Sequence, residues 1–118
     1  MGYRRLELHE KLCEILGSRN VYFQPPESVK MKYPAIVYRL YDIDNNHGDN
    51  FPYLQFYGYE VTLIHKDPDN TVVEELSKLP SCRFNRFFTS ENLNHYVFAL
   101  YVIGKTKEDD EEAENIGG

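Results

Sequence analysis

The sequence predicts an α+β fold: an antiparallel sheet of four to five strands, with an N-terminal helix and a second short helix packed on one face. Apolar residues recur at helical spacing in segments 3–17 and 66–80. β-Branched and aromatic residues dominate the segments between and after them, and the chain contains ten Tyr and seven Phe. The resulting order of helix, strands, helix, strands favours helices gathered on one face of the sheet.

The first helix is expected over residues 3–17. Its apolar stripe, at i, i+4, i+7 and i+8 spacing, consists of Leu8, Leu12, Ile15 and Leu16. Gly17 is suited to the position just after the helix, where a left-handed backbone is common.

Three extended segments should follow this helix. A short one lies in "NVYFQPP", where two prolines end it. Residues 35–43, "AIVYRLYDI", are β-branched and aromatic throughout and predict a strand. Residues 53–65 predict a longer one, with Gly58 as a candidate bulge or bend.

The second helix is predicted within residues 66–80. Asp67 is the expected N-cap and Pro68 the first helical residue. The apolar side of this helix would be formed by Val72, Val73, Leu76 and Leu79.

Two last strands are expected at 82–88 and 94–103, joined by a five-residue hairpin connection, "TSENL". Both faces of the segment 94–103 are substantially apolar, which predicts a central position in the sheet. Residues 1–103 are expected to form a single domain. Residues 104–118, with six acidic residues and two lysines, are expected to be an acidic, flexible C-terminal tail.

The composition argues against several partners. The net charge of −6 disfavours a nucleic-acid backbone as ligand, because such proteins need clustered Lys and Arg. The N-terminal segment does not resemble a signal peptide, and the apolar runs are too short for a membrane span. Cys13 and Cys82 are expected to be core or half-buried thiols in a reducing compartment.

The stretch "DIDNNHGDNFPY" invites comparison with a calcium loop. Asp42, Asp44 and Asn46 match its first three ligand positions. However, His47 stands where Gly is needed and Tyr53 where the bidentate Glu is needed. Turn geometry explains these Asn, Asp and Gly residues better than calcium does.

Catalytic and cofactor sites are not predicted. The histidines at 9, 47, 65 and 95 have no metal-ligand spacing, the serines have no G-x-S-x-G setting, and the chain has no glycine-rich phosphate loop. Helix capping accounts for the acidic residues of 65–69 without chemistry. An enzyme is therefore the minority interpretation.

Tyrosines are unusually common on the predicted strands. The set is Tyr38, Tyr41, Tyr53, Tyr57, Tyr59, Tyr96 and Tyr101. Their hydroxyls need water or a hydrogen-bonding partner. Two interpretations stay open: cross-strand aromatic ladders within the sheet, or an interface between subunits.

The order of these segments resembles a known group of proteins. A helix ending at "LG" precedes "VYFQPP", a "YPAIVYRL" strand, a long strand ending in "VTLIHKDP", a short helix and a closing hairpin. This arrangement, over about residues 5–103, is similar to that of the tail-terminator or tail-completion (tail-to-head joining) proteins of long-tailed bacteriophages. The acidic tail lies outside the resemblance.

The resemblance implies a structural protein rather than an enzyme. It implies a homo-oligomer, usually a six-fold ring, that stops tail-tube polymerisation and joins the tube to head connector or neck proteins. Such a protein is assembled in the bacterial host cytoplasm and ends in the virion, at the head-proximal end of the tail. DNA would pass through the ring without sequence-specific binding, and an acidic surface would suit that passage.

A closed ring requires two different complementary patches on each subunit. The turn-rich loop after residue 43 is the predicted arm toward a neighbour or the tube. Its expected contact residues are Asp44, Asn45, Asn46, His47, Gly48, Asp49, Asn50 and Phe51.

Two alternatives remain beside the tail-terminator interpretation. One is a head-closure or neck adaptor protein of the same particle. The other is a small cytoplasmic ligand-binding or enzymatic α+β domain. A deep pocket with convergent polar groups would favour the last, and a flat, aromatic, self-complementary surface would favour a ring-forming protein.

Overall fold

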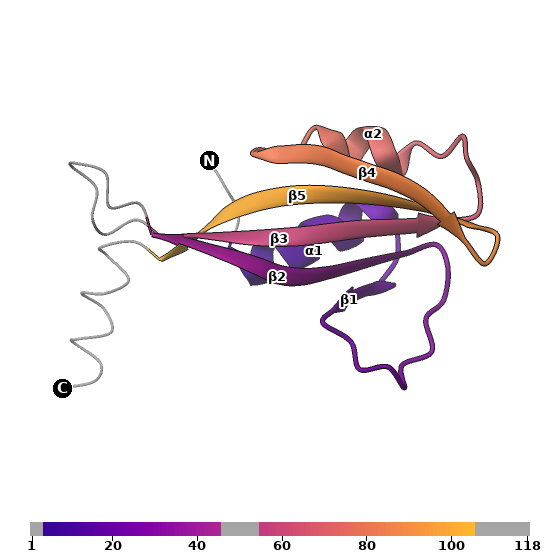
Figure 1. Ribbon diagram of the computed structural model, residues 1–118, viewed down its shortest axis with the longest axis horizontal. Helices are drawn as coiled ribbons and strands as arrows, with labels where there is room; N and C mark the ends of the chain where they lie inside the picture. Colours follow the sequence, from indigo (N-terminus) through magenta and orange to yellow (C-terminus); the bar gives the residue numbers. More distant parts are fainter. Residues whose placement is uncertain (1–3, 46–54, 106–118) are drawn as a thin grey trace.

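The computed structural model describes residues 4–45 and 55–105 (Figure 1). The elements in chain order are α1 (Arg5–Leu16), β1 (Val21–Phe23), β2 (Ala35–Asn45), β3 (Gln55–His65), α2 (Val72–Ser77), β4 (Cys82–Ser90) and β5 (Leu93–Lys105). The described strands form one sheet in the order β1-β2-β3-β5-β4. This confirms the predicted α+β class and the central position of the last strand. The sheet is mixed, because β1 pairs with β2 in parallel while the other pairs are antiparallel.

Both helices cover the same face of the sheet, hereafter the helix face. Leu8, Leu12 and Cys13 of α1 are buried there. They meet Leu76 and Leu79 from α2 and the segment after it. The sheet contributes Val21, Ile36, Tyr38, Tyr59, Val61, Leu63, Phe98, Leu100 and Val102. Burial of this apolar set is the main favourable contribution to folding.

The predicted end of α1 is confirmed. Gly17 has φ +81°, a left-handed conformation, and its N–H donates to the Cys13 carbonyl at 2.8 Å. A glycine adopts this conformation without the steric cost that a side chain would add.

The second helix begins later than the sequence pattern predicts. Asp67 is not its N-cap: the Asp67 carboxylate accepts a hydrogen bond from the Asp69 N–H at 2.8 Å and closes a turn before the helix. Asn70 instead accepts from the Val73 N–H at 3.1 Å, within the first turn of α2. Pro68 therefore lies in the turn, not at the first helical position.

A β-bulge in β2 positions one end of the sheet. The register shifts between Leu40 and Asp42, so Tyr41 is the extra residue opposite β3. The prediction of a bulge at Gly58 is thus wrong, because the extra residue lies on the neighbouring strand. Gly58 serves a close approach instead: a Cβ there would lie 2.8 Å from Cε1 of Tyr101.

A second bulge shapes β4, where the register shifts between Phe84 and Arg86. Partners across an antiparallel ladder share a face. Phe84 opposite Phe98, and Phe87 opposite Tyr96, therefore lie on the helix face. Arg86 opposite Val97 lies on the other face, hereafter the open face.

The connection between β4 and β5 is shorter than predicted. Ser90 pairs with Leu93, so only Glu91 and Asn92 form the turn. Both have positive φ values, +53° and +64°. Positive φ at both central residues is characteristic of a two-residue type I′ hairpin turn, which matches the twist of its strands.

Candidate assembly surfaces

The open face carries a chain of hydrogen bonds at the end of the sheet nearest the β2 bulge. The Tyr101 hydroxyl donates to Oδ2 of Asp42 at 2.7 Å, and the Tyr41 hydroxyl donates to Tyr101 at 3.2 Å. These hydrogen bonds, with Tyr41 and then with Asp42, raise the pKa of Tyr101 well above its usual range. The Tyr101 ring lies over Gly58, so the strand register, the glycine and the acid together fix its position.

A hollow of about 610 Å³ adjoins this chain. Its lining residues are Tyr41, Asp44, Phe56, Ser81, Cys82, Arg83, Ala99 and Tyr101. Burial raises the pKa of the Cys82 thiol to about 11, so this sulfur is protonated near neutral pH. A protonated thiol is a poor nucleophile. The hollow therefore offers a cation and an anion, Arg83 and Asp44, rather than an activated catalytic group.

Charged side chains continue along the open face. Glu60 of β3 lies 3.2 Å from Nε of Arg39 and 3.8 Å from Nη1 of Arg86. Within the described residues, Arg83 takes part in no ion pair. One guanidinium of β4 thus remains available to an external acid.

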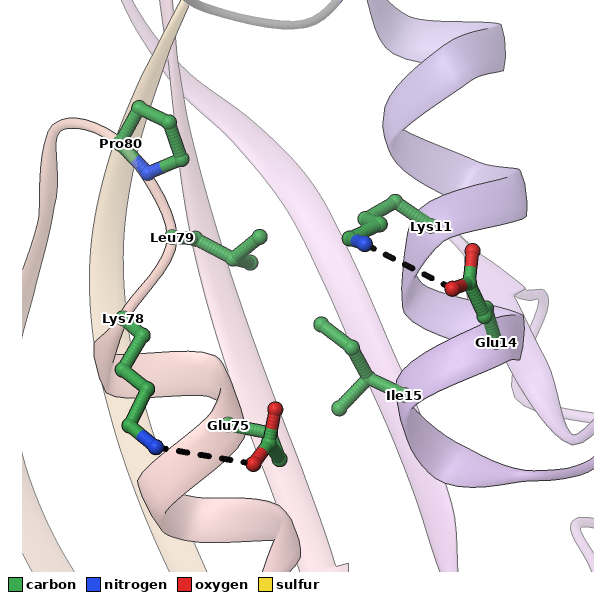
Figure 2. A pocket seen from close by; sticks show the side chains of 7 residues that line it. All are labelled: Lys11, Glu14, Ile15, Glu75, Lys78, Leu79 and Pro80. Carbon is green, nitrogen blue, oxygen red and sulfur yellow. Dashed lines mark ion pairs between the residues drawn. The ribbon is translucent and has the colours of Figure 1, made fainter.

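A groove of about 460 Å³ separates α1 from the segment that contains α2 (Figure 2). Ile15 and Leu79 extend into it from opposite sides. Its charges are paired locally: Lys11 with Glu14 of α1 at 3.6 Å, and Lys78, just after α2, with Glu75 at 3.7 Å. Because each charge already has a counter-ion, this groove offers little to an ionic ligand.

Most of the exposed large apolar side chains lie on two strands, β2 and β4, toward opposite ends of the sheet order. Eight large hydrophobic residues are exposed in the described chain. Five of them lie on two strands: Tyr41 and Ile43 on β2, and Phe84, Phe87 and Phe88 on β4. Phe84 and Phe87 are 52% and 50% exposed. Aromatic residues at this exposure, next to Arg, are typical of the residues enriched in protein interfaces.

The predicted contact residues are only partly placed. Asp44 and Asn45 form the end of β2 rather than a loop. The remaining six, residues 46–51, lie outside the described residues.

The aromatic edge of β4 was missed as a candidate surface. Residues 82–88 were predicted correctly as a strand, but a strand's place in the sheet order is set by distant pairings. One local signal exists: "RFNRFF" puts aromatic residues on both faces of a strand that also carries two Arg. That pattern suits an edge strand better than a central one.

The tyrosines divide between the two interpretations left open by the sequence. Tyr38 and Tyr59 are buried in the core with their rings 5.7 Å apart, edge to face. Tyr41 and Tyr101 lie on the open face and bond each other. The ladder interpretation therefore applies to the first pair, and the second pair is placed where a partner can reach it.

The described residues contain no group of three or more His, Cys, Asp or Glu side chains arranged to hold a metal ion. Asp42 and Asp44, two of the calcium ligands considered above, lie in β2, and Asp42 already accepts the Tyr101 hydroxyl. Asn46, His47 and Tyr53 lie outside the described residues.

Comparisons with known proteins give no family: no protein-family model matches the chain, and no curated protein matches it. In the part of the chain that the structure describes, none of the helices has the length and apolarity needed to cross a membrane.

Proposed function

We propose that this chain is a structural subunit of a long-tailed bacteriophage, which forms a ring at the head-proximal end of the tail, terminates the tail tube and joins it to the head connector. The sequence resemblance motivates the proposal. The single observation that supports it best is the concentration of exposed aromatic and apolar side chains on two different strands, β2 and β4. A heterologous ring requires two unlike patches on each subunit, and these strands supply two.

The proposal is tested first in the phage or prophage genome that encodes the chain. Deleting the coding sequence should give tail tubes of uncontrolled length that fail to join heads, as seen by negative-stain electron microscopy. Supplying the protein from a plasmid should restore tails of uniform length. Tails of normal length without the protein would overturn the proposal.

A neck adaptor is the alternative from the same particle, and the same images distinguish it. Loss of an adaptor leaves tails of normal length and heads that lack a closure. Labelled protein would then be found on heads rather than on tube ends.

The hollow beside Tyr101 is the observation that favours the ligand-binding alternative, because Asp44 and Arg83 line it with opposite charges. A screen of small zwitterionic and aromatic metabolites by thermal shift tests it. A saturable rise in the thermal unfolding midpoint that is lost in Arg83→Ala would support a ligand site over an assembly surface.

Removal of residues 105–118 tests the idea that the acidic tail eases DNA passage. If like-charge repulsion keeps DNA from sticking, the truncated protein should slow or trap DNA during injection. Unchanged infectivity would count against it.

A further inference from the structure

The two exposed edges of the sheet carry opposite charges. In the described chain, β1 pairs only with Ile36–Tyr38, and the Gln24 side chain accepts from the Leu40 N–H. Arg39, before this point, is paired with Glu60. Residues 41–45 of β2 therefore have no strand on the side away from β3. That free stretch contains Asp42 and Asp44 and no basic residue. The opposite edge is formed by β4 (Figure 1), which contains Arg83 and Arg86 and no acidic residue.

The charges also lie on the same face of the sheet. Asp42 and Asp44 pair with Gly58 and Phe56, on the face of Glu60. Arg83 and Arg86 pair with Ala99 and Val97, on that same open face. Exposed apolar side chains also lie at both edges on the helix face: Ile43 at one edge, and Phe84 and Phe87 at the other.

From this match we propose that β4 of one copy docks on residues 41–44 of β2 in the next copy, so that the sheet continues from subunit to subunit. The two strands run in opposite directions within one subunit, because three antiparallel pairings separate them. Copies placed side by side therefore meet in an antiparallel alignment. This interface rests on the proposed ring and names the surfaces that close it.

One register satisfies both faces at once. It places Arg83 opposite Asp44 and Arg86 opposite Asp42 on the open face. It places Phe84 opposite Ile43 on the helix face, with Asn85 as the bulged residue between the two Arg positions. Opposite charges directly across a strand pair stabilise it, as do apolar pairs.

The same features disfavour pairing between two identical edges. In an antiparallel β4–β4 contact, the cations Arg83 and Arg86 would face cations, and like charges directly opposite destabilise a strand pair. The bulge further interrupts a regular ladder. The edges therefore select the unlike partner, which gives a head-to-tail assembly rather than a two-fold dimer.

The test uses two charge reversals in the full chain, Arg83→Glu and Asp44→Lys. Each should raise the concentration at which half the protein is assembled by about tenfold or more, measured by light scattering behind size exclusion. Matched controls with the same charge changes are Lys66→Glu and Asp69→Lys, whose side chains lie at neither edge. These controls should assemble like the wild type.

Two restorations distinguish the specific contact from a folding defect. An equimolar mixture of the Arg83→Glu and Asp44→Lys chains should assemble, because each chain then offers an edge complementary to the other. The double variant should assemble alone. Single variants that assemble normally, or a mixture and a double variant that both stay monomeric, would overturn the proposal, as would a wild-type chain that stays monomeric at every concentration.

These outcomes separate the interface from the function. If the wild type forms rings and both charge-reversal variants form them equally well, the proposed interface is wrong and the tail-terminator proposal stands. If ring formation requires both edges but phage without the protein makes tails of normal length, the interface stands and the tail-terminator function is wrong.

Discussion

Tyr38 and His9 form a polar contact at the margin of the core. The Tyr38 ring is fully buried against Phe23 and Tyr59. Its hydroxyl lies 2.7 Å from Nδ1 of His9, and Arg5 donates to it at 3.5 Å. A buried hydroxyl without such partners would cost folding free energy, so the α1 side chains make this aromatic core residue tolerable.

The environment of His9 leads to a pH dependence of stability. Burial, followed by the nearby Arg19 charge, lowers the pKa of His9 from its ordinary value of 6.5. Below about pH 6.5 the unfolded chain therefore binds a proton more readily than the folded one, and stability falls with pH until the lower folded pKa is passed. In the variant His9→Gln, the unfolding free energy should fall less as the pH is lowered from about 7.5 to about 5, as measured by urea unfolding. Parallel pH curves for the two proteins would contradict the assignment.

At the scale of elements, the three central strands are locked together by a close approach at Gly58. The Tyr101 ring occupies the space where a side chain would lie, and its hydroxyl is held by Asp42 across the strand between them. Side chain, glycine and acid come from three adjacent strands, β5, β3 and β2. The register of these three strands is therefore fixed by this side-chain contact as well as by the backbone hydrogen bonds between them.

Gly58→Ala should force the Tyr101 ring away from its position. The expected cost is about 1–3 kcal/mol of unfolding free energy, measured by urea denaturation. The pKa of Tyr101 should also fall toward its ordinary value, as followed by the ultraviolet absorbance of tyrosinate. Adding Gly58→Ala to Tyr101→Ser should cost less, because the ring is already gone and only the 3.1 Å approach to Cβ of Asp42 remains. An equal cost in both backgrounds would show that the ring is not the cause.

The turn between β4 and β5 holds two side-chain-bearing residues in the left-handed region. Changing Glu91 to Asn together with Asn92 to Gly would install the sequence that a type I′ turn prefers. The change should raise the unfolding free energy by about 1 kcal/mol, since left-handed backbone is costly for most residues. The control Glu91→Gln alters only the charge and should change little. A lower thermal midpoint in the Asn-Gly variant would contradict the turn type.

The sequence predicted elements well where the signal is local. The stripe of Leu8 and Leu12 gave α1, and Gly17 gave its end. Local signals failed where two short-range options compete: Asp67 can cap a helix or close a turn, and the turn contact with Asp69 is the one formed. The parallel pairing of β1 also escaped prediction, because three residues carry no information about strand direction.

At the scale of the whole molecule, the proposed assembly depends on which strands lie at the edges of the sheet. Neither the position of β4 nor the free stretch of β2 can be read from a local pattern, since both follow from the strand order. The candidate contacts predicted from the turn-rich stretch therefore included Asp44 and missed Arg83. The opposite charges of the two edges became visible only once the sheet was assembled.

Assembly through these edges should depend on salt. Exposed ion pairs are screened at distances beyond about 8 Å at physiological ionic strength and beyond about 3 Å at 1 M. Raising NaCl from about 0.05 M to about 0.5 M should therefore shift the wild-type protein toward monomers in light scattering. A purely apolar interface would respond in the opposite direction or not at all. A variant with Phe84→Ser would separate the two contributions, because it removes apolar area and leaves the charges in place.

The strand order also affects the folding rate of a subunit. Three of the four neighbouring pairs in the described sheet join consecutive strands, and only the β3–β5 pair spans other elements, α2 and β4. Short closed loops make such pairings kinetically accessible, so the chain should complete its fold soon after synthesis. A newly made subunit would then present finished edges before it meets a second copy, and the rate of the proposed ring formation would be set by encounter between subunits rather than by folding.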